Sequence, residues 1–310
     1  MPTLILPSLI TFILLILAIA FFTLLERKIL GYAQIRKGPN KVGLAGLPQP
    51  LADALKLFIK SRTNPHYRNK TPYILAPILS LILALLLWSL YTSPNPPFHF
   101  TFGFLFFLVV SRLNVYGTLI AGWSSNSKYS LLGALRALAQ TISYEVSIAL
   151  ILLTPLILAS SYNLINLSPP QTPFPWILHL SLLARIWFIT TLAETNRAPF
   201  DFAEGESELV SGFNVEYRGT PFAFIFIAEY LNILLIRFLT ATLFINITRS
   251  TLIISLTNWI KTLLFAFLFL WVRATLPRLR YDLLIRLTWK IFLPTTLILT
   301  IFYVNTHPLI

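Results

Sequence analysis

Six of the eleven carboxylates in this 310-residue chain are concentrated between two apolar stretches, in the run AETNRAPFDFAEGESELVSGFNVEY. They are Glu194, Asp201, Glu204, Glu206, Glu208 and Glu216. An acidic cluster joined directly to membrane helices is typical of a site that handles protons, cations or a cationic ligand. A solvated acidic loop is the alternative that the charge pattern leaves open.

Glu204, Glu206 and Glu208 occupy alternate positions. In an extended chain, the three side chains would project to one side, about 6–7 Å apart. Carboxylates that close raise one another's pKa and titrate as a coupled group, which can hold protons near neutral pH. In a helical segment the three side chains would splay around the axis, and this argument weakens. Pro199 indicates that a preceding helix does not continue into the segment.

Other ionisable side chains fall inside apolar stretches, where each is costly unless it is paired or hydrated. They are Arg112, Arg136, Tyr144, Glu145, Arg185, Glu229, Tyr230 and Arg237. Arg136 and Glu145 are nine residues apart, so on one helix they lie on opposite faces and must contact different partners. An interhelical ion pair would explain any one of these charges. A hydrated proton path explains Glu145, Glu229 and the acidic run together.

The composition indicates an integral membrane protein, since 56% of the residues are hydrophobic, 11% are charged and the mean hydropathy is +0.75. No internal repeat or polar domain is evident, so a single membrane domain over 1–310 is predicted. The fold class is all-α, and eight stretches are long and apolar enough to cross a bilayer as helices. The predicted spans are 3–25, 72–91, 102–122, 133–158, 174–193, 221–245, 251–272 and 286–304.

Several classes of function are excluded by what the chain lacks. Its net charge is +13, but the basic residues flank apolar stretches and form no stripe with stacking aromatics, so nucleic acid is not an expected partner. With no cysteine, the chain can hold neither a disulfide nor an iron–sulfur cluster, and its four histidines lack ligand spacing for a metal. No dinucleotide loop, phosphate loop or nucleophile motif is present, so the chain is not expected to perform redox chemistry alone.

Lysine and arginine in the connections predict the orientation of the spans. Ten lie between the first two spans, and alternate connections together carry sixteen, against Arg249 alone on the other face. Both termini are therefore expected on the side away from the compartment of synthesis, with 26–71 and the acidic segment 194–220 on the synthesis side. No basic residue precedes the first apolar stretch, as a signal or transit peptide would require, so insertion is expected where the chain is made.

The first connection contains a predicted amphipathic helix at 47–60. One face carries Gln49, Asp53, Lys56 and Lys60, and another carries Leu47, Leu51, Leu55 and Phe58. Such a helix lies along a membrane surface or docks on a soluble partner.

Three runs carry a family resemblance that extends over essentially the whole chain. ERKILGYAQIRKGPNKVGLAGLPQPLADALKLF, GALRALAQTISYEV and AETNRAPFDFAEGESELVSGFNVEYRGTPF closely resemble the signatures of subunit 1 of mitochondrial NADH–ubiquinone oxidoreductase, respiratory complex I. The resemblance implies a heel subunit of a proton-pumping NADH:ubiquinone reductase, at the junction of the membrane and peripheral arms. That subunit helps form the ubiquinone tunnel and begins an acidic path that links quinone reduction to proton translocation. Because a lipid-soluble quinone needs an apolar entrance at membrane level, the resemblance implies a tunnel opening near the helix 47–60 and the spans 3–25 and 221–245.

The resemblance also assigns roles to individual positions. The coupling path would include Tyr144, Glu145, Glu194, Asp201, Glu204, Glu206, Glu208, Glu216, Glu229 and Tyr230. The quinone tunnel would include Glu26, Arg36, Asp53, Leu55, Phe58, Arg136, Arg197, Phe200, Phe202, Arg273 and Arg278. Arg112, Arg218 and Arg237 depart from the family pattern, which has small or neutral residues there, so the local charge balance is specific to this chain.

The resemblance implies partners and a location as well. FMN and the iron–sulfur clusters would be held by other complex I subunits, and ubiquinone and phospholipids would contact this chain. The mitochondrial inner membrane is the expected location, and the strong hydrophobicity fits a product of the organelle's own genome. A proton-coupled or cation transporter using the same carboxylates is the competing interpretation. A purely structural scaffold leaves the intramembrane carboxylates unexplained.

Overall fold

The computed structural model describes residues 2–61, 63, 65–92, 98–167, 171, 174–203, 205–245 and 251–306, with side chains except at 2–7, 165, 206–207 and 251–256. Within these ranges the chain is helical throughout and contains no strand. The long helices are α1 (Pro2–Ala33), α3 (Lys70–Trp88), α4 (Gly103–Ser124), α5 (Lys128–Ala159), α9 (Thr220–Phe244) and α10 (Thr251–Thr275). The shorter elements are α2 (Gln49–Ile59), η1 (Ile165–Leu167), α6 (Trp176–His179), α7 (Ser181–Glu194), α8 (Glu206–Leu209), η3 (Gly212–Asn214), α11 (Tyr281–Leu287), the π-helical turn η4 (Thr288–Phe292) and α12 (Leu293–Thr306).

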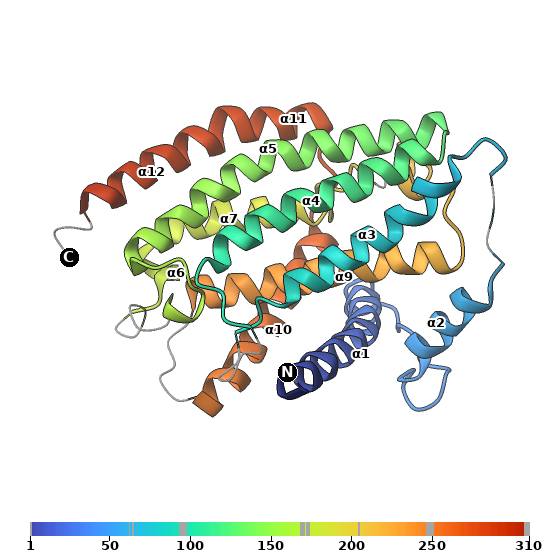
Figure 1. Cartoon of the computed structure of the whole chain (residues 1–310), viewed down its shortest axis with the longest axis horizontal. Coiled ribbons are helices and arrows are strands. Elements are labelled where there is room, and N and C mark those ends of the chain that lie inside the picture. The colour runs from blue at the N-terminus through green and yellow to red at the C-terminus, as the bar shows by residue number, and fades with distance from the viewer. Residues whose placement is uncertain are drawn as a thin grey trace.

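The long helices form a bundle in which α3, α4, α5 and α9 run along the long axis of the molecule (Figure 1). Helix α4 packs between α3 and α5, and α9 packs on α3 and α10. Helix α12 lies along the outer side of α5, while α1 runs obliquely and contacts α2, α9 and α10. Helix α7 lies against both α5 and α9. The acidic segment that follows α7 is thereby held against the centre of the bundle.

Two glycines let backbones approach closely around α5. A Cβ at Gly122 of α4 would lie 2.3 Å from the Cβ of Ala134, and one at Gly133 would lie 2.7 Å from the backbone nitrogen of Phe213. Small residues at such crossings are a usual means of packing helices in membranes. The second contact seats η3, within the acidic segment, directly on α5.

Six helices in the described residues are long and apolar enough to cross a membrane: Ser8–Ala33, Lys70–Trp88, Gly103–Ser124, Lys128–Ala159, Thr220–Phe244 and Tyr281–Thr306. They coincide with six of the eight predicted spans, and α10 occupies the predicted span 251–272. Helix α1 continues to Ala33, beyond residue 25, where the first predicted span ends. Phe22 and Glu26 consequently lie on one continuous helix, one turn apart.

The prediction of one continuous helix at 174–193 is wrong. Helix α6 ends at His179, and α7 begins at Ser181 after Leu180, which has φ −102° and ψ 37°. Leu180 is 1% exposed, so the break is stabilised by its packing in the core and carries no proline or glycine signal. The helix predicted at 47–60 is present as α2, with Leu51, Leu55 and Phe58 exposed.

Candidate functional site

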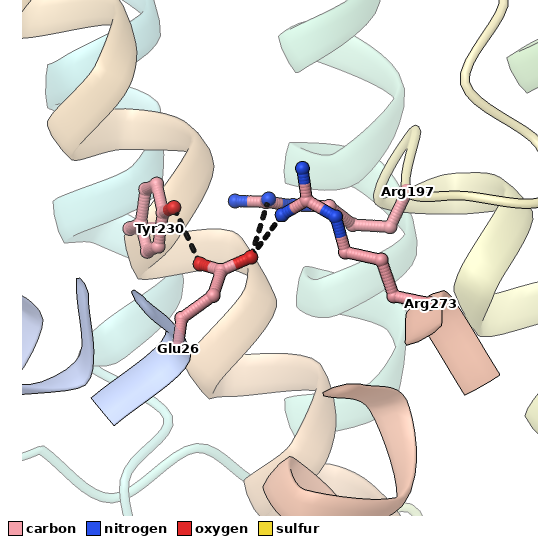
Figure 2. Close-up of polar contacts among 4 residues, drawn as sticks. All are labelled: Glu26, Arg197, Tyr230 and Arg273. Carbon is pink, nitrogen blue, oxygen red and sulfur yellow. Dashed lines mark hydrogen bonds and ion pairs between the residues drawn. The ribbon is translucent and has the colours of Figure 1, made fainter. Parts of the chain in front are cut away.

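A buried carboxylate, Glu26, lies at the centre of a polar cluster formed by four segments of the chain. Its side chain is 5% exposed, and Arg197 and Arg273 both donate to Oε1, with Arg197 Nη1 at 3.1 Å. Tyr230 donates its hydroxyl to Oε2 at 2.6 Å. Figure 2 shows the two guanidinium groups converging on one carboxylate oxygen while Tyr230 reaches the other. These four residues are called the Glu26 cluster below.

Arg197 reaches this cluster because of how α7 ends. The backbone N–H of Asn196 bonds to Ala193 O, and that of Arg197 bonds to Leu192 O, which is the Schellman pattern at a helix C-terminus. Asn196 takes the left-handed conformation that this motif requires, with φ +48°, and asparagine tolerates it better than most residues. The chain therefore turns out of α7 directly toward Glu26.

The charge of Arg197 is fixed by its neighbours. Burial by itself would lower the pKa of the guanidinium, but the Glu26 carboxylate and the Tyr230 hydroxyl outweigh burial and raise the pKa above its ordinary value. The guanidinium also lies over the Tyr230 ring, 4.6 Å from its centre, where a cation is attracted electrostatically. The Glu26 cluster is thus a closed arrangement in which each carboxylate oxygen has a donor.

A second polar site is a small cavity beside the first, between α3, α4, α7 and α9. Its volume is about 60 Å³, and its polar lining includes Asn114, Glu194, Thr195, Asn196, Glu229 and Asn232. A neighbouring cavity of about 30 Å³ shares Asn114, Glu194 and Asn232. Both volumes exceed the space that one water molecule needs. The pair is called the Glu194 cavity below.

Several polar atoms around the Glu194 cavity are buried without a hydrogen-bond partner among the described residues. They are Glu145 Oε1, Glu194 Oε2, Asn196 Oδ1 and Asn232 Oδ1. Buried polar oxygens beside a cavity large enough for water are the usual environment of ordered internal water. The arrangement can therefore hold a short hydrated path that begins at a buried carboxylate.

Arg136 and Glu145 of α5 have different partners, as their spacing predicts. Arg112 of α4 pairs with Glu145 at 3.6 Å, and Arg136 pairs with Glu208 of α8. Glu145 also lies close enough to Glu194 for the two carboxylates to interact electrostatically. Tyr144, next along the helix, is fully buried, and its ring centre lies 6.3 Å from that of Phe200.

Of the two conformations that the sequence leaves open for the alternating carboxylates, the structure shows the helical one at Glu206–Leu209. Residues Glu206–Leu209 form the helical turn α8, so positions 206 and 208 do not project to one side of an extended strand. Glu204 and the side chain of Glu206 lie outside the described residues. Glu208 is half exposed, and its hydrogen bond from Arg136 lowers the pKa of its carboxyl below the ordinary value. Glu208 is therefore charged at neutral pH.

Residues of the first connection lie apart from both sites. Asp53 on α2 pairs with Arg27 of α1 at 2.6 Å and accepts from Gln49 at 2.9 Å. Because Arg27 follows Glu26 in sequence, this contact ties α2 to the end of α1 nearest the Glu26 cluster. Arg36 is exposed, with its Nε 2.9 Å from Gln34 Oε1.

The remaining predicted residues lie along the acidic segment and its neighbours. Phe200 and Phe202 are 4% and 1% exposed, so both pack in the core, and the Arg278 guanidinium lies 5.2 Å from the centre of the Phe202 ring. Asp201 is partly exposed. The carbonyl of Glu216 accepts from Tyr73 at 2.7 Å, and Tyr217 stacks on Tyr73 with ring centres 4.3 Å apart. Burial raises the pKa of Tyr217 to about 12, so its hydroxyl is neutral at physiological pH.

Gln140 is a site residue that the sequence interpretation did not single out. Its side-chain amide is fully buried and donates to the carbonyls of Ala193 at 2.8 Å and Phe200 at 2.9 Å. These carbonyls flank the turn that carries Glu194 and Arg197. Gln140 therefore fixes to α5 the segment that serves both sites. Gln140 lies within the run GALRALAQTISYEV, which carries the family resemblance, and this position could have indicated its importance.

The comparisons with known proteins give matches over nearly the whole chain. The model of a family described as NADH dehydrogenase matches residues 6–304. The chain belongs to this family. In the part of this family member that the structure describes, no group of three or more histidine, aspartate and glutamate side chains is placed to hold a metal ion.

Individual relatives give the same result at high identity. The NADH-ubiquinone oxidoreductase chain 1 of Balaenoptera physalus is 53% identical over 307 residues, which cover 98% of this chain and 94% of that protein. The protein of the same name from Hylobates lar is 52% identical over 310 residues, covering 99% and 95%. That of Emballonura alecto is 53% identical over 293 residues, covering 94% and 92%. The resemblance that the sequence motifs predict is confirmed.

Proposed function

We propose that this chain is a core membrane subunit of the proton-pumping NADH–ubiquinone oxidoreductase of the mitochondrial inner membrane. It lines part of the ubiquinone tunnel and begins the acidic path that couples quinone reduction to proton translocation. Other subunits of the complex hold FMN and the iron–sulfur clusters, and ubiquinone is the substrate. Family membership and the names of the relatives support the assembly into this enzyme.

One observation carries the coupling role: the Glu26 cluster and the Glu194 cavity are built on the same two short segments. Glu194 and Arg197 are three residues apart at the end of α7, and Glu229 and Tyr230 are adjacent on α9. Arg197 also interacts electrostatically with Glu229. A change in the charge or position of Arg197 or Tyr230 would therefore act electrostatically on Glu194 and Glu229 directly, with no other element between them.

The tunnel role is proposed for the Glu26 cluster and the residues that support it. Arg197 and Arg273 present guanidinium donors, and helices α1, α2 and α9 contact one another around the predicted entrance. The exposed apolar side chains of α2 suit a helix that lies on the membrane surface. Quinone tails would enter there. Arg36, Asp53, Arg136, Phe200, Phe202 and Arg278 are proposed as the wider lining and support of the tunnel.

The proton-path role is proposed for Glu194, with Glu229 and Glu145 leading away from it. The other residues of the proposed path are Tyr144, Asp201, Glu204, Glu206, Glu208, Glu216 and Tyr230, the last of which also belongs to the Glu26 cluster. Each buried carboxylate can bind and release one proton, and waters in the Glu194 cavity would carry it between carboxylates. An electrostatic change at the quinone would shift the proton from one group to the next.

The membrane arrangement proposed with this function has eight spans in a single domain over 1–310. Two of these spans are additional to the six apolar helices described above. One is formed by α6 together with α7, and the other is α10. Both termini would face the intermembrane space, since the strongly basic connection 26–71 and the segment 194–220 would then face the matrix. Protease or labelling access to 34–48 from the intermembrane space would contradict this orientation.

Glu194→Gln in the assembled enzyme tests the proposal, because it keeps the shape of the side chain and deletes its charge and proton. Quinone reduction and proton pumping in sealed vesicles should fall together, roughly 10- to 100-fold, with assembly retained. Asp282→Asn is the matched control, since Asp282 is an exposed carboxylate paired with Arg280 at 3.3 Å, away from both sites. Normal rates and pumping in Glu194→Gln would leave Glu194 with a structural role only.

A further inference from the structure

Arg237 is a buried cation that lies next to the Glu26 cluster but forms no part of it. It is 2% exposed and lies on α9 seven residues after Tyr230, so the two side chains share a face of that helix. Its guanidinium carbon lies 4.4 Å from the centre of the Phe22 ring and 4.7 Å from that of Phe269. The cation is thus held between two aromatic rings.

The three helices around Arg237 form two successive layers. Phe22 precedes Glu26 by four residues on α1, and Phe269 precedes Arg273 by four residues on α10. Four residues are about one helical turn, or about 6 Å along the axis. On α9, Arg237 lies about two turns after Tyr230, but helical side chains lean toward the N-terminus, and its guanidinium reaches the level of the Phe22 and Phe269 rings. Glu26, Tyr230 and Arg273 therefore form one layer, and Phe22, the Arg237 guanidinium and Phe269 form the next.

The charge of Arg237 is not compensated within its own layer. Its Nε and Nη1 have no hydrogen-bond partner in the described part of the chain, and the two rings carry no net charge. A guanidinium stays protonated even when buried, so the charge persists. Glu26 is the carboxylate with which Arg237 interacts electrostatically, while Arg197 repels it. The stability of this buried cation thus depends on the negative charge of Glu26.

We propose that Arg237 is a positioning residue for the quinone tunnel, which keeps the Glu26 carboxylate ionised and in place between Arg197 and Arg273. The inference rests on the proposed tunnel role of the Glu26 cluster and adds to it separate roles for Arg237 and Glu26. Glu26 is a fixed countercharge throughout turnover and carries no proton. Family resemblance predicts a neutral residue at position 237, so this layer is a feature of this chain's own sequence.

A double-variant comparison in the assembled complex tests the dependence between the two layers. Glu26→Gln should reduce the amount of assembled enzyme at least tenfold, because three guanidinium groups then lose their carboxylate. Adding Arg237→Met should restore assembly severalfold, whereas adding Arg185→Met, at an exposed arginine of α7, should not. A double variant that assembles no better than Glu26→Gln would overturn the proposal. This arm needs no quinone, so it stays informative even if the tunnel role is wrong.

The Arg237→Met single variant supplies a readout that simple packing would not change. The groups that face Glu26 are Arg197, Tyr230 and Arg273 directly, with Arg237 beneath. Without Arg237, Glu26 takes up a proton more easily, so the acid limb of the pH profile for ubiquinone reduction should move to higher pH. The KM for ubiquinone should rise severalfold, and Arg237→Lys should restore both. An unchanged pH profile in Arg237→Met, whatever its rate, would reduce Arg237 to a space-filling side chain.

Discussion

The Glu26 cluster and the Glu194 cavity contain the same kind of group in opposite environments. Both acceptor oxygens of Glu26 are used, by two arginines and a tyrosine. Around Glu194 the structure shows buried amide and carboxylate oxygens without partners in the described chain, and space for water. A carboxylate saturated by cations is a fixed charge, whereas one beside water and other carboxylates can exchange a proton. Under the proposed function, these surroundings would separate the tunnel role of the Glu26 cluster from proton exchange at Glu194, although Glu194 and Arg197 are only three residues apart.

The largest expected effect comes from Glu26→Gln, which removes the charge of the carboxylate whose two oxygens both have donors. Removing one partner of a buried ion pair destabilises a protein by about 3–5 kcal/mol, since the remaining charge is left uncompensated. We expect little assembled enzyme, measured by native electrophoresis of membranes. Glu26→Asp, which keeps the charge, should assemble better than Glu26→Gln. Equal assembly of Glu26→Gln and Glu194→Gln would erase the distinction between the two regions.

Gln140→Leu should weaken both regions at once while leaving every charge in place. It leaves the carbonyls of Ala193 and Phe200 without their donor, at a cost of roughly 1–3 kcal/mol. The turn that carries Glu194 and Arg197 should then loosen. Quinone reduction and pumping should both fall severalfold, and proteolysis of 194–205 should become faster. An effect on only one of the two activities would show that the regions are positioned independently.

A bulky residue on α2 should affect the tunnel without affecting the proton path. Leu55 is 61% exposed, and Phe58 is 50% exposed, so a larger side chain there changes the surface and spares the core. Leu55→Trp should raise the KM for long-tailed quinones severalfold and that for short soluble analogues little. The number of protons pumped per quinone reduced should not change. Equal inhibition with both kinds of quinone would count against entry at this helix.

The smallest effect is expected for Glu208→Gln. The Arg136–Glu208 pair lowers the pKa of Glu208 from an ordinary value of 4.5, so the stability it contributes is present above that pH. This stability is lost as the pH falls through the lowered value, well below physiological pH. An exposed pair contributes little in any case. Turnover between pH 6 and pH 8 should stay close to that of the wild type, and a strong loss there would show that Glu208 is an essential member of the proposed proton path.

The helices and the types of residue in the site could be predicted from the sequence, but which of these residues contact one another could not. The 3.6-residue period correctly separated Arg136 from Glu145, since that contact pattern is local. The role of Tyr230 in the coupling path stays a proposal, but its hydrogen bond to Glu26, 204 residues away, was not predicted. No local signal encodes such a contact, which arises only when α1 and α9 pack together.

Two features of the backbone have the same origin. The break at Leu180, which the sequence did not indicate, is held by core packing, and 206–209, for which the sequence left extended and helical conformations open, forms α8 after Gly205, which has φ +46°. Short segments follow their tertiary surroundings more than their own propensity. The resemblance supplied Arg197 and Arg273 as tunnel residues, but only the packed helices bring them onto one oxygen of one carboxylate.

The most direct test of the account is infrared difference spectroscopy of the assembled enzyme on quinone reduction. If Glu194 exchanges a proton while Glu26 does not, the wild type should show a change in the carboxyl C=O stretching region. That change should be lost in Glu194→Gln and retained in Asp282→Asn. A carboxyl signal of full size in Glu194→Gln would contradict the assignment of proton exchange to the Glu194 cavity.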